Sequence, residues 1–180
     1  MSMTLPIIET ERLVLRRMMS YDAPALHAML SDPETMQYWS TPPHVTLAET
    51  EEWVAEGIAA TARGDGHDFV VLESDRLIGR VAFWMGNEIG FLFSRAVWGK
   101  GYAREAMNAV LRYGFEQLDY KTVRADVDPE NVRSLKLLER VGFKRTGFAE
   151  RTFKIGERWV DSVYLELKSE AFALSSRRDQ

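Results

Sequence analysis

The segment Trp98–Ala103 holds the residue types best suited to binding a ligand. Gly99 and Gly101 let a ligand approach the backbone closely, because neither carries a Cβ atom. A helix is predicted to follow, and the first amides of a helix have no intrahelical partner and lie at the positive end of its dipole. A turn between a strand and a helix therefore suits a diphosphate. The cationic side chains of Lys100 and Arg104 add to this attraction.

A glycine-containing turn that only caps a helix is the alternative interpretation, and spacing alone does not decide between the two. Two known phosphate-binding patterns are excluded. The pattern G-x-G-x-x-G fails because Arg104 stands where its third glycine belongs. The pattern G-x-x-x-x-G-K-[ST] is absent from the chain.

The elements around this segment are predicted from hydrophobic periodicity. Ala103–Leu118 is the clearest helix, since its apolar residues follow the i, i+3, i+4, i+7 rule. Strands are expected at Asp68–Leu72, Arg76–Met85 and Asn87–Phe93, with connections short enough for hairpins. Thr46, with Glu49 three residues later, predicts a capping box. The other expected elements are strands at Arg12–Arg16, Thr122–Val127, Phe143–Phe153 and Trp159–Leu167, and helices at Tyr21–Leu30, Thr46–Ala62 and Glu130–Val141.

The resulting order is β-α-α-β-β-β-α-β-α-β-β, which predicts an α/β (α+β) fold with a mixed sheet and helices on its faces. The absence of repeats and linkers predicts one domain over residues 1–174. Residues 175–180 are expected to form a flexible tail.

Composition restricts the class of protein. The chain is 46% hydrophobic and 28% charged, as in soluble globular domains, and its net charge of −4 argues against a general nucleic-acid binder. No segment approaches the roughly 20 apolar residues that span a bilayer, and Met1–Glu11 does not resemble a secretory signal. Without cysteine, a disulfide, a thiolate zinc site and a cysteine nucleophile are excluded. We expect a cytoplasmic protein with no direct nucleic-acid or membrane partner.

The three histidines do not predict a metal site. His27, His44 and His67 lie on separate expected elements and lack the H-x-x-x-H spacing. His27 is instead expected near the substrate pocket or in a polar cluster.

The run Trp98–Ala106 resembles the acyl-CoA loop of the GNAT acetyltransferases, whose pattern is Q/R-x-x-G-x-G/A. Gly101 and Ala103 match its last two positions, whereas Trp98 replaces the first, as in the branch similar to the ribosomal-protein alanine N-acetyltransferases. The resemblance covers nearly the whole chain. Its other matching segments are Glu11–Arg16, Asp32–Met36, Asn131–Ser134 and Glu139–Phe143.

This resemblance implies acetyl-CoA as co-substrate and no metal. It also implies a mostly antiparallel sheet of seven strands, two of them splayed apart around the pantetheine arm. The main chain of the strand Phe91–Phe93 would bind that arm, and the amides of Gly99–Arg104 would bind the diphosphate. The complete cofactor-binding set expected is Phe91, Leu92, Phe93, Trp98, Gly99, Lys100, Gly101, Tyr102, Ala103, Arg104, Asn131 and Ser134.

Acetyl transfer requires an amine that has lost a proton, a stabilised carbonyl oxygen and a donor for the leaving thiolate. By the resemblance, Glu88 is the candidate base, Ser134 the candidate acid and the Leu92 amide the candidate oxyanion donor. Many family members use a tyrosine acid seven positions after the asparagine, but that position holds Leu138. The alternatives are an exposed strand-end carboxylate for Glu88, a surface hydroxyl for Ser134 and a helix N-cap for Asn131.

The acceptor pocket is expected between the two N-terminal helices and the C-terminal hairpin. A set of aromatic residues with one acid would suit a cationic amine. Trp84 and Trp159 each have a core position as their stronger alternative. The expected lining residues are His27, Tyr38, Trp39, Trp84, Trp159 and Asp161.

The predicted function is transfer of acetyl from acetyl-CoA to a primary amine, first of all a peptide N-terminal α-amine. A polyamine, an amino acid or an aminoglycoside remains an open acceptor. A catalytically silent acyl-CoA-binding regulatory protein is the alternative from another class. Both a monomer and a homodimer remain open.

Overall fold

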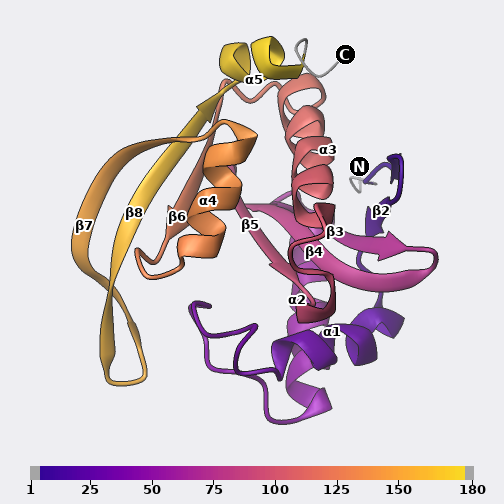
Figure 1. Ribbon diagram of the computed structural model, residues 1–180. Helices are drawn as coiled ribbons and strands as arrows, with labels where there is room; N and C mark the ends of the chain where they lie inside the picture. Colours follow the sequence, from indigo (N-terminus) through magenta and orange to yellow (C-terminus); the bar gives the residue numbers. More distant parts are fainter. Residues whose placement is uncertain (1–4, 177–180) are drawn as a thin grey trace.

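The computed structural model describes residues 5–176, which form one eight-stranded sheet with helices on both faces (Figure 1). The order across the sheet is β1-β2-β3-β4-β5-β6-β8-β7. The strands are β1 Ile8–Glu9, β2 Val14–Arg17, β3 Gly66–Glu73, β4 Arg76–Trp84, β5 Glu88–Phe93, β6 Thr122–Val127, β7 Lys144–Ile155 and β8 Arg158–Lys168. The helices are α1 Ala23–Leu30, α2 Leu47–Arg63, α3 Tyr102–Glu116, α4 Val132–Val141 and α5 Ser169–Ser176, with short 3-10 turns η1 Ser20–Asp22 and η2 Arg95–Val97.

The α+β class and the mixed, mostly antiparallel sheet are confirmed, but the expected seven strands are wrong by one. The additional strand is β1, which has two residues and pairs with β2. A strand of this length is too short to show the alternation that identifies a strand in a sequence. At the other end, α5 contains Ser175 and Ser176, the first residues of the expected tail. The rest of that tail lies outside the described residues.

At the middle of the sheet, the neighbouring strands β5 and β6 are paired over a very short stretch. All neighbouring strands are antiparallel except β5 and β6, which are parallel and share one register pair, Glu88 with Arg124. Beside that pair, the amide of Arg124 donates to the carbonyl of Asn87 over 2.9 Å, and Asn87 Nδ2 donates to the carbonyl of Thr122 over 2.6 Å. The two strands then diverge, so β1–β5 and β6–β8–β7 form two halves (Figure 1).

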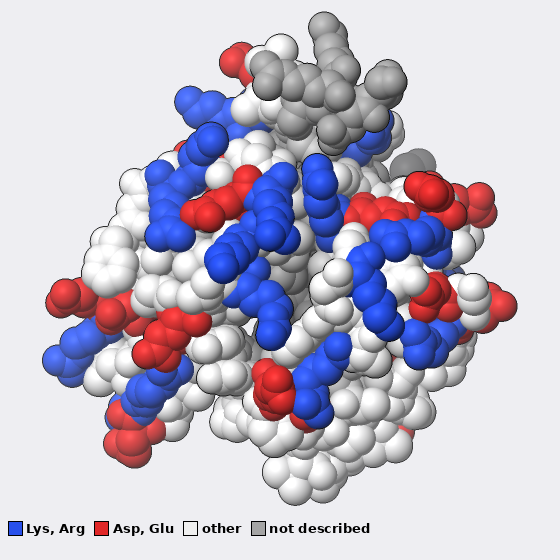
Figure 2. Space-filling model, in the orientation of Figure 1, with Lys and Arg blue, Asp and Glu red and all other residues white. Residues whose placement is uncertain are grey.

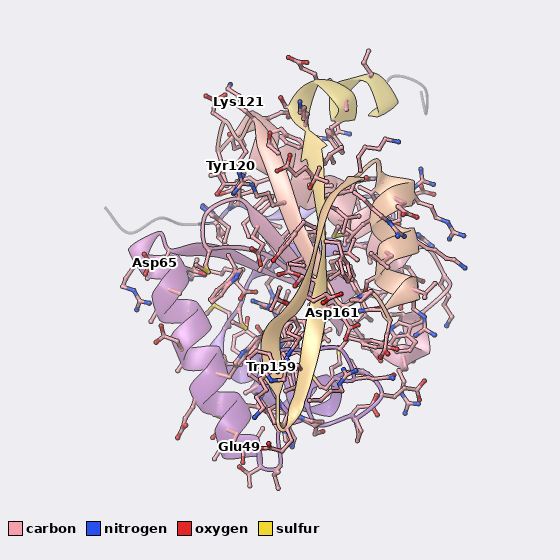
Figure 3. All side chains as sticks on the ribbon, turned by 90° about the vertical axis from the view of Figure 1, so that its left-hand side faces the viewer. Glu49, Asp65, Tyr120, Lys121, Trp159 and Asp161 are labelled. Atoms are coloured by element: carbon pink, nitrogen blue, oxygen red, sulfur yellow. The ribbon has the colours of Figure 1, made fainter. Side chains whose placement is uncertain are left out.

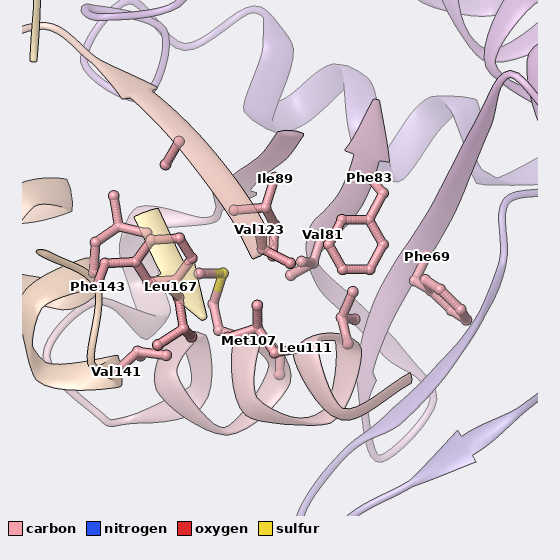
Figure 4. Close-up of a cluster of buried hydrophobic side chains, with 14 of the residues drawn as sticks. Phe69, Val81, Phe83, Ile89, Met107, Leu111, Val123, Val141, Phe143 and Leu167 are labelled. Atoms are coloured by element: carbon pink, nitrogen blue, oxygen red, sulfur yellow. The ribbon is translucent and has the colours of Figure 1, made fainter. Parts of the chain in front are cut away.

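The larger core lies between α3, α4 and one face of the sheet (Figure 4). Met107 and Leu111 of α3 are buried against Val81, Phe83 and Val123 of the strands, as the periodicity of α3 predicts. Because this core includes residues from both halves of the sheet, it fixes the halves relative to one another even though their strands hardly pair.

A second, smaller core lies under α1 and α2 on the opposite face, where Leu26, Val54 and Leu92 are buried. The α2 helix begins at the predicted N-cap, with the Thr46 hydroxyl accepting from the Glu49 amide, but Glu49 accepts from the Val45 amide and not from the N-cap amide that the predicted capping box requires. The α4 helix ends at Gly142, whose φ of +113° favours glycine. The two cores leave β5 covered on both faces.

The contact of α3 with both halves can be tested with Leu111→Ala. Leu111 is fully buried, so its truncation should leave a cavity and lower the free energy of unfolding by about 2–5 kcal/mol. Leu174→Ala on α5 is the matched control, because Leu174 is 65% exposed and should change stability by less than about 0.5 kcal/mol. Urea unfolding measures both, and equal losses in the two variants would contradict this description of the core.

Candidate active site

The turn before α3 has the backbone conformation of an anion-binding loop. Gly99 and Gly101 have φ values of +76° and +83°, in the left-handed region that favours glycine. Gly101 is the N-cap residue of α3, and no side chain caps this helix end. A Cβ atom on Gly99 would meet nothing within 4 Å, so the glycine is needed for its conformation and leaves open space at the loop. The first amides of a fifteen-residue helix are thereby left for a ligand.

Positive charge surrounds this helix end. Lys and Arg side chains gather over the middle of the face drawn in Figure 2, the region that α3 and α4 occupy in Figure 1. Lys100, Arg104 and Arg133 are exposed there. The Arg133 guanidinium lies 3.8 Å from the centre of the Trp98 ring, which links α4 to the loop. The donor set and charge fit the diphosphate of a coenzyme.

The divergence of β5 from β6 supplies the second part of the site. Beyond Glu88, no residue of β5 pairs with β6, so the side of β5 that faces the split has no partner strand among the described residues. Phe93 does not offer a fully available carbonyl, because Trp98 Nε1 donates to it over 2.9 Å. Trp98 therefore closes the end of β5, and its indole N–H is bonded within the protein.

Asn131 and Ser134 lie at the start of α4, beside this split. Asn131 is the N-cap residue, and its Oδ1 accepts from the Ser134 amide over 3.1 Å. The capping alternative is therefore part of the structure. Capping uses only the oxygen, however, and leaves the two Nδ2 hydrogens for a ligand. Ser134 is partly exposed, and its hydroxyl makes no hydrogen bond with the described residues.

Glu88 stands at the vertex of the split, on the only register pair between β5 and β6. It is half-buried, not a freely exposed strand-end carboxylate. Burial raises the pKa of Glu88, and the negative charge of Asp126 raises it further, while the Trp84 indole and Arg124 lower it in part. A carboxylate with a raised pKa at this position is suited to accept a proton near neutral pH.

The aromatic residues expected around the acceptor lie in two places: in the connection between α1 and α2, and on the strands β4 and β8. Tyr38 and Trp39 lie in the connection between α1 and α2, where Trp39 is half-buried against the smaller core. Trp84 and Trp159 are 58% and 46% exposed, so the core alternative for both is wrong. Trp84 lies beside Glu88 in register.

Asp161 has a role within the β7–β8 hairpin. Its Oδ1 accepts from the Arg151 amide over 2.8 Å, and the Arg151 guanidinium lies 5.1 Å from the centre of the Trp159 ring. Figure 3 shows Trp159 and Asp161 on the lower part of this hairpin, at the side of the molecule where the N-terminal end of α2, marked by Glu49, also lies. The hairpin thus contributes aromatic surface, whereas the Asp161 carboxylate is engaged with the backbone.

Comparison with known proteins decides the family. The model of the acetyltransferase (GNAT) domain matches residues 12–144 of this chain. The chain belongs to the GNAT acetyltransferase family. It is accordingly an acetyl-CoA-dependent N-acetyltransferase. An uncharacterized N-acetyltransferase p20 of Bacillus licheniformis is 33% identical over 172 residues, which cover 91% of this chain and 97% of that protein.

Two relatives of this GNAT enzyme have named acceptors. A spermidine N(1)-acetyltransferase of Vibrio cholerae is 29% identical over 83% of this chain and 89% of its own length. The [ribosomal protein uS5]-alanine N-acetyltransferase of Escherichia coli is 33% identical over 44% of this chain and 41% of its own length.

Solved structures agree with the fold. A GNAT acetyltransferase from Bacillus anthracis matches with a TM-score of 0.81 at 28% identity, over 92% of this chain and 99% of that one. The spermidine N-acetyltransferase from Vibrio cholerae, solved in complex with CoA and spermine, matches with a TM-score of 0.80 at 25% identity, over 91% and 99% of the two chains.

The histidines of this GNAT domain take part in internal hydrogen bonds. His27 Nδ1 and His44 Nδ1 both contact the buried Thr50 hydroxyl, at 2.7 and 2.8 Å, and so connect α1, the following loop and α2. His67 is buried and its Nδ1 lies 3.1 Å from the Tyr113 hydroxyl. Among the described residues no group of three or more His, Asp or Glu side chains could hold a metal ion. None of the described helices is long and apolar enough to cross a membrane.

Sequence reasoning missed Asp126, a second carboxylate two residues beyond the vertex on β6. It is an exposed residue, yet desolvation by the surrounding protein raises its pKa, opposed by a hydrogen bond with Ser162. Arg124 and Asp126 alternate with the buried Val123 and Ala125, so the strand pattern does indicate their common face. What the pattern lacks is the sheet order, which puts β6 next to β5 and hence Asp126 near Glu88.

The function of Glu88 is testable by its pH dependence. If the ionised carboxylate is the base, kcat/KM should fall as pH decreases through a pKa above that of an ordinary glutamate. Glu88→Gln should lower kcat/KM at neutral pH by about 10²-fold and abolish this acid limb. Glu116→Gln, at the exposed end of α3, is the control and should match the parent enzyme. An unchanged rate and pH profile in Glu88→Gln would refute the assignment.

A separate test addresses Ser134. Loss of its hydroxyl in Ser134→Ala should lower kcat by about 10²-fold with little change in the Kd of acetyl-CoA, because a donor to the leaving thiolate acts only in the reaction. Steady-state kinetics and calorimetry separate the two effects. Ser169→Ala at the start of α5 is the control. A normal kcat in Ser134→Ala would remove Ser134 from the mechanism.

Proposed function

We propose that this enzyme acetylates the N-terminal α-amine of a polypeptide, on the face of the sheet that carries Glu88. The observation that carries the proposal is a half-buried carboxylate at the strand split whose register neighbour on β4, Trp84, is exposed. An exposed aromatic side chain beside the base accommodates an acceptor that continues beyond its amine, as a polypeptide does. The similarity to an alanine N-acetyltransferase of a ribosomal protein supports the same acceptor class.

Each residue then has one task. The amides of Gly99–Arg104 and the Lys100 side chain hold the diphosphate of acetyl-CoA, and the open side of β5 holds its pantetheine arm. Glu88 removes a proton from the ammonium, directly or through water, so that the nitrogen can attack the thioester carbonyl. The amide of Leu92, expected to stabilise the negative oxygen, faces β4 through its register pair with Arg80, so this task passes to the amide of Phe91 on the split side of β5. The C–S bond breaks as the amide forms, and the Ser134 hydroxyl donates a proton to the leaving thiolate.

A polyamine is the second candidate acceptor, and one observation favours it. A single ammonium needs one carboxylate, yet Asp126 adds a second negative charge close enough to raise the pKa of Glu88. A molecule with several ammonium groups would be attracted by both. The similarity to a spermidine acetyltransferase over most of the chain supports this candidate.

Release of free CoA thiol distinguishes the two acceptors. The assay should contain peptides with a free N-terminal alanine or serine, the same peptides with a blocked N-terminus, and spermidine. We expect kcat/KM at least about tenfold higher for the free peptides than for spermidine, and no release above background with blocked peptides. Mass spectrometry of the product should place the acetyl group on the α-nitrogen. Faster turnover of spermidine would select the second candidate, and amine-independent release would refute both.

A further inference from the structure

The turn between β1 and β2 makes side-chain contacts with the cofactor loop that the proposed mechanism does not use. Arg12, at its centre, lies about ninety positions from that loop in sequence but contacts it at three points. Its Nε donates to Glu105 over 2.7 Å, its Nη1 donates to the Lys100 carbonyl over 3.1 Å, and its guanidinium lies 4.3 Å from the centre of the Tyr102 ring. One side chain thus holds both the loop and the first turn of α3.

Glu105 explains why such a contact matters for an anion. Its carboxylate lies in the first turn of α3, where it would oppose a bound diphosphate. The Thr10 hydroxyl donates to it over 2.6 Å, the Arg12 amide over 2.9 Å, and Arg12 Nη2 lies 2.7 Å away. Burial by itself would raise the pKa of Glu105, but these bonds lower it overall, so the group is ionised and neutralised by Arg12.

Arg12 also restricts the conformation of the loop. A Cβ atom on Gly101 would lie 3.4 Å from Arg12 Nη2, so the guanidinium packs directly against the left-handed N-cap residue. On the far side of Arg12, the Tyr102 hydroxyl donates a short hydrogen bond to Glu73 at the end of β3. Lys100, Gly101 and Tyr102 are therefore each held by a contact outside the loop.

We propose that Arg12 is a positioning residue for acetyl-CoA, which neutralises Glu105 and fixes the Lys100–Tyr102 backbone so that the helix amides are free to bind the diphosphate. The proposal rests on the proposed binding of the diphosphate at Gly99–Arg104. Arg12 acts through the loop and not on the reacting atoms. Replacing Arg12 should therefore weaken the binding of acyl donors that contain a diphosphate and leave the binding of donors without a diphosphate unchanged.

Arg16 provides a matched control on the neighbouring strand. Its guanidinium forms a bidentate pair with Asp22, with Nη1 and Nη2 each 2.8 Å from a carboxylate oxygen. This pair is more buried than that of Arg12, with side-chain exposures of 21% and 4% against 41% and 18%, and makes no contact with the loop. If general destabilisation were the cause of weaker binding, Arg16→Gln should show it at least as strongly.

The experiment measures Kd for CoA by calorimetry and kcat/KM for acetyl-CoA and for S-acetylpantetheine, which lacks the diphosphate. For Arg12→Gln we expect Kd for CoA to rise about tenfold, because a charged hydrogen-bonded pair is lost. The kcat/KM for acetyl-CoA should fall by a similar factor, and that for S-acetylpantetheine should change less than about twofold. Arg16→Gln should leave Kd and both kcat/KM values near those of the parent enzyme.

Glu105→Gln in the Arg12→Gln background distinguishes a loss of charge neutralisation from a loss of structure. Because the double variant has no unpaired carboxylate at the helix end, it should recover part of the lost CoA affinity. Thr10→Val, which removes one bond to Glu105 and keeps Arg12, is the variant to use if Arg12→Gln does not fold, and should show a smaller effect of the same kind.

The outcomes separate this proposal from the one on which it rests. Equal loss for acetyl-CoA and S-acetylpantetheine, or normal CoA affinity in Arg12→Gln, would overturn the role of Arg12 while the acetyltransferase site stands. If kcat/KM of the parent enzyme is no higher for acetyl-CoA than for S-acetylpantetheine, the loop does not hold the diphosphate, and both the loop assignment and the role of Arg12 fail.

Discussion

The single register pair between Glu88 and Arg124 is the constraint on which the site depends. A continuous β5–β6 ladder would satisfy the backbone of both strands and leave no place for an extended arm. Complete separation would leave the two halves of the sheet connected only through side chains. One rung, supported by Asn87 on the Thr122 carbonyl, keeps the strands together at one point and lets them diverge from there. The core under α3 holds the two halves of the sheet together in place of the missing strand pairing, because its buried side chains come from both halves.

The split also explains why the candidate residues meet at one place. Glu88 is at the vertex, the open side of β5 leads away from it, and the chain then enters the loop whose glycines precede α3. In the proposed mechanism, the thioester thus lies near the vertex and the diphosphate at the helix end. The acceptor approaches from the face of Trp84 and Asp126, opposite the α3 core.

Much of this arrangement can be predicted from the sequence, because α3 and the hairpins have strong local patterns. The resemblance of Trp98–Ala106 to an acyl-CoA loop located the helix end correctly. Other features depend on distant contacts and cannot be predicted from local patterns. The two-residue strand β1 exists only because β2 pairs with it, and Asp126 is near Glu88 only through the sheet order. Similarly, no local pattern indicates that Arg12 neutralises Glu105, which lies 93 positions away in the sequence.

Amide hydrogen exchange with and without CoA tests the central claim most directly, since it reports on backbone groups residue by residue. The account predicts that CoA slows exchange in β5 beyond Glu88 and in the turn Gly99–Arg104, while the β3–β4 turn, Ser74–Asp75, exchanges at the same rate in both states. Protection confined to another region, or no added protection at the α3 end and along β5, would contradict it.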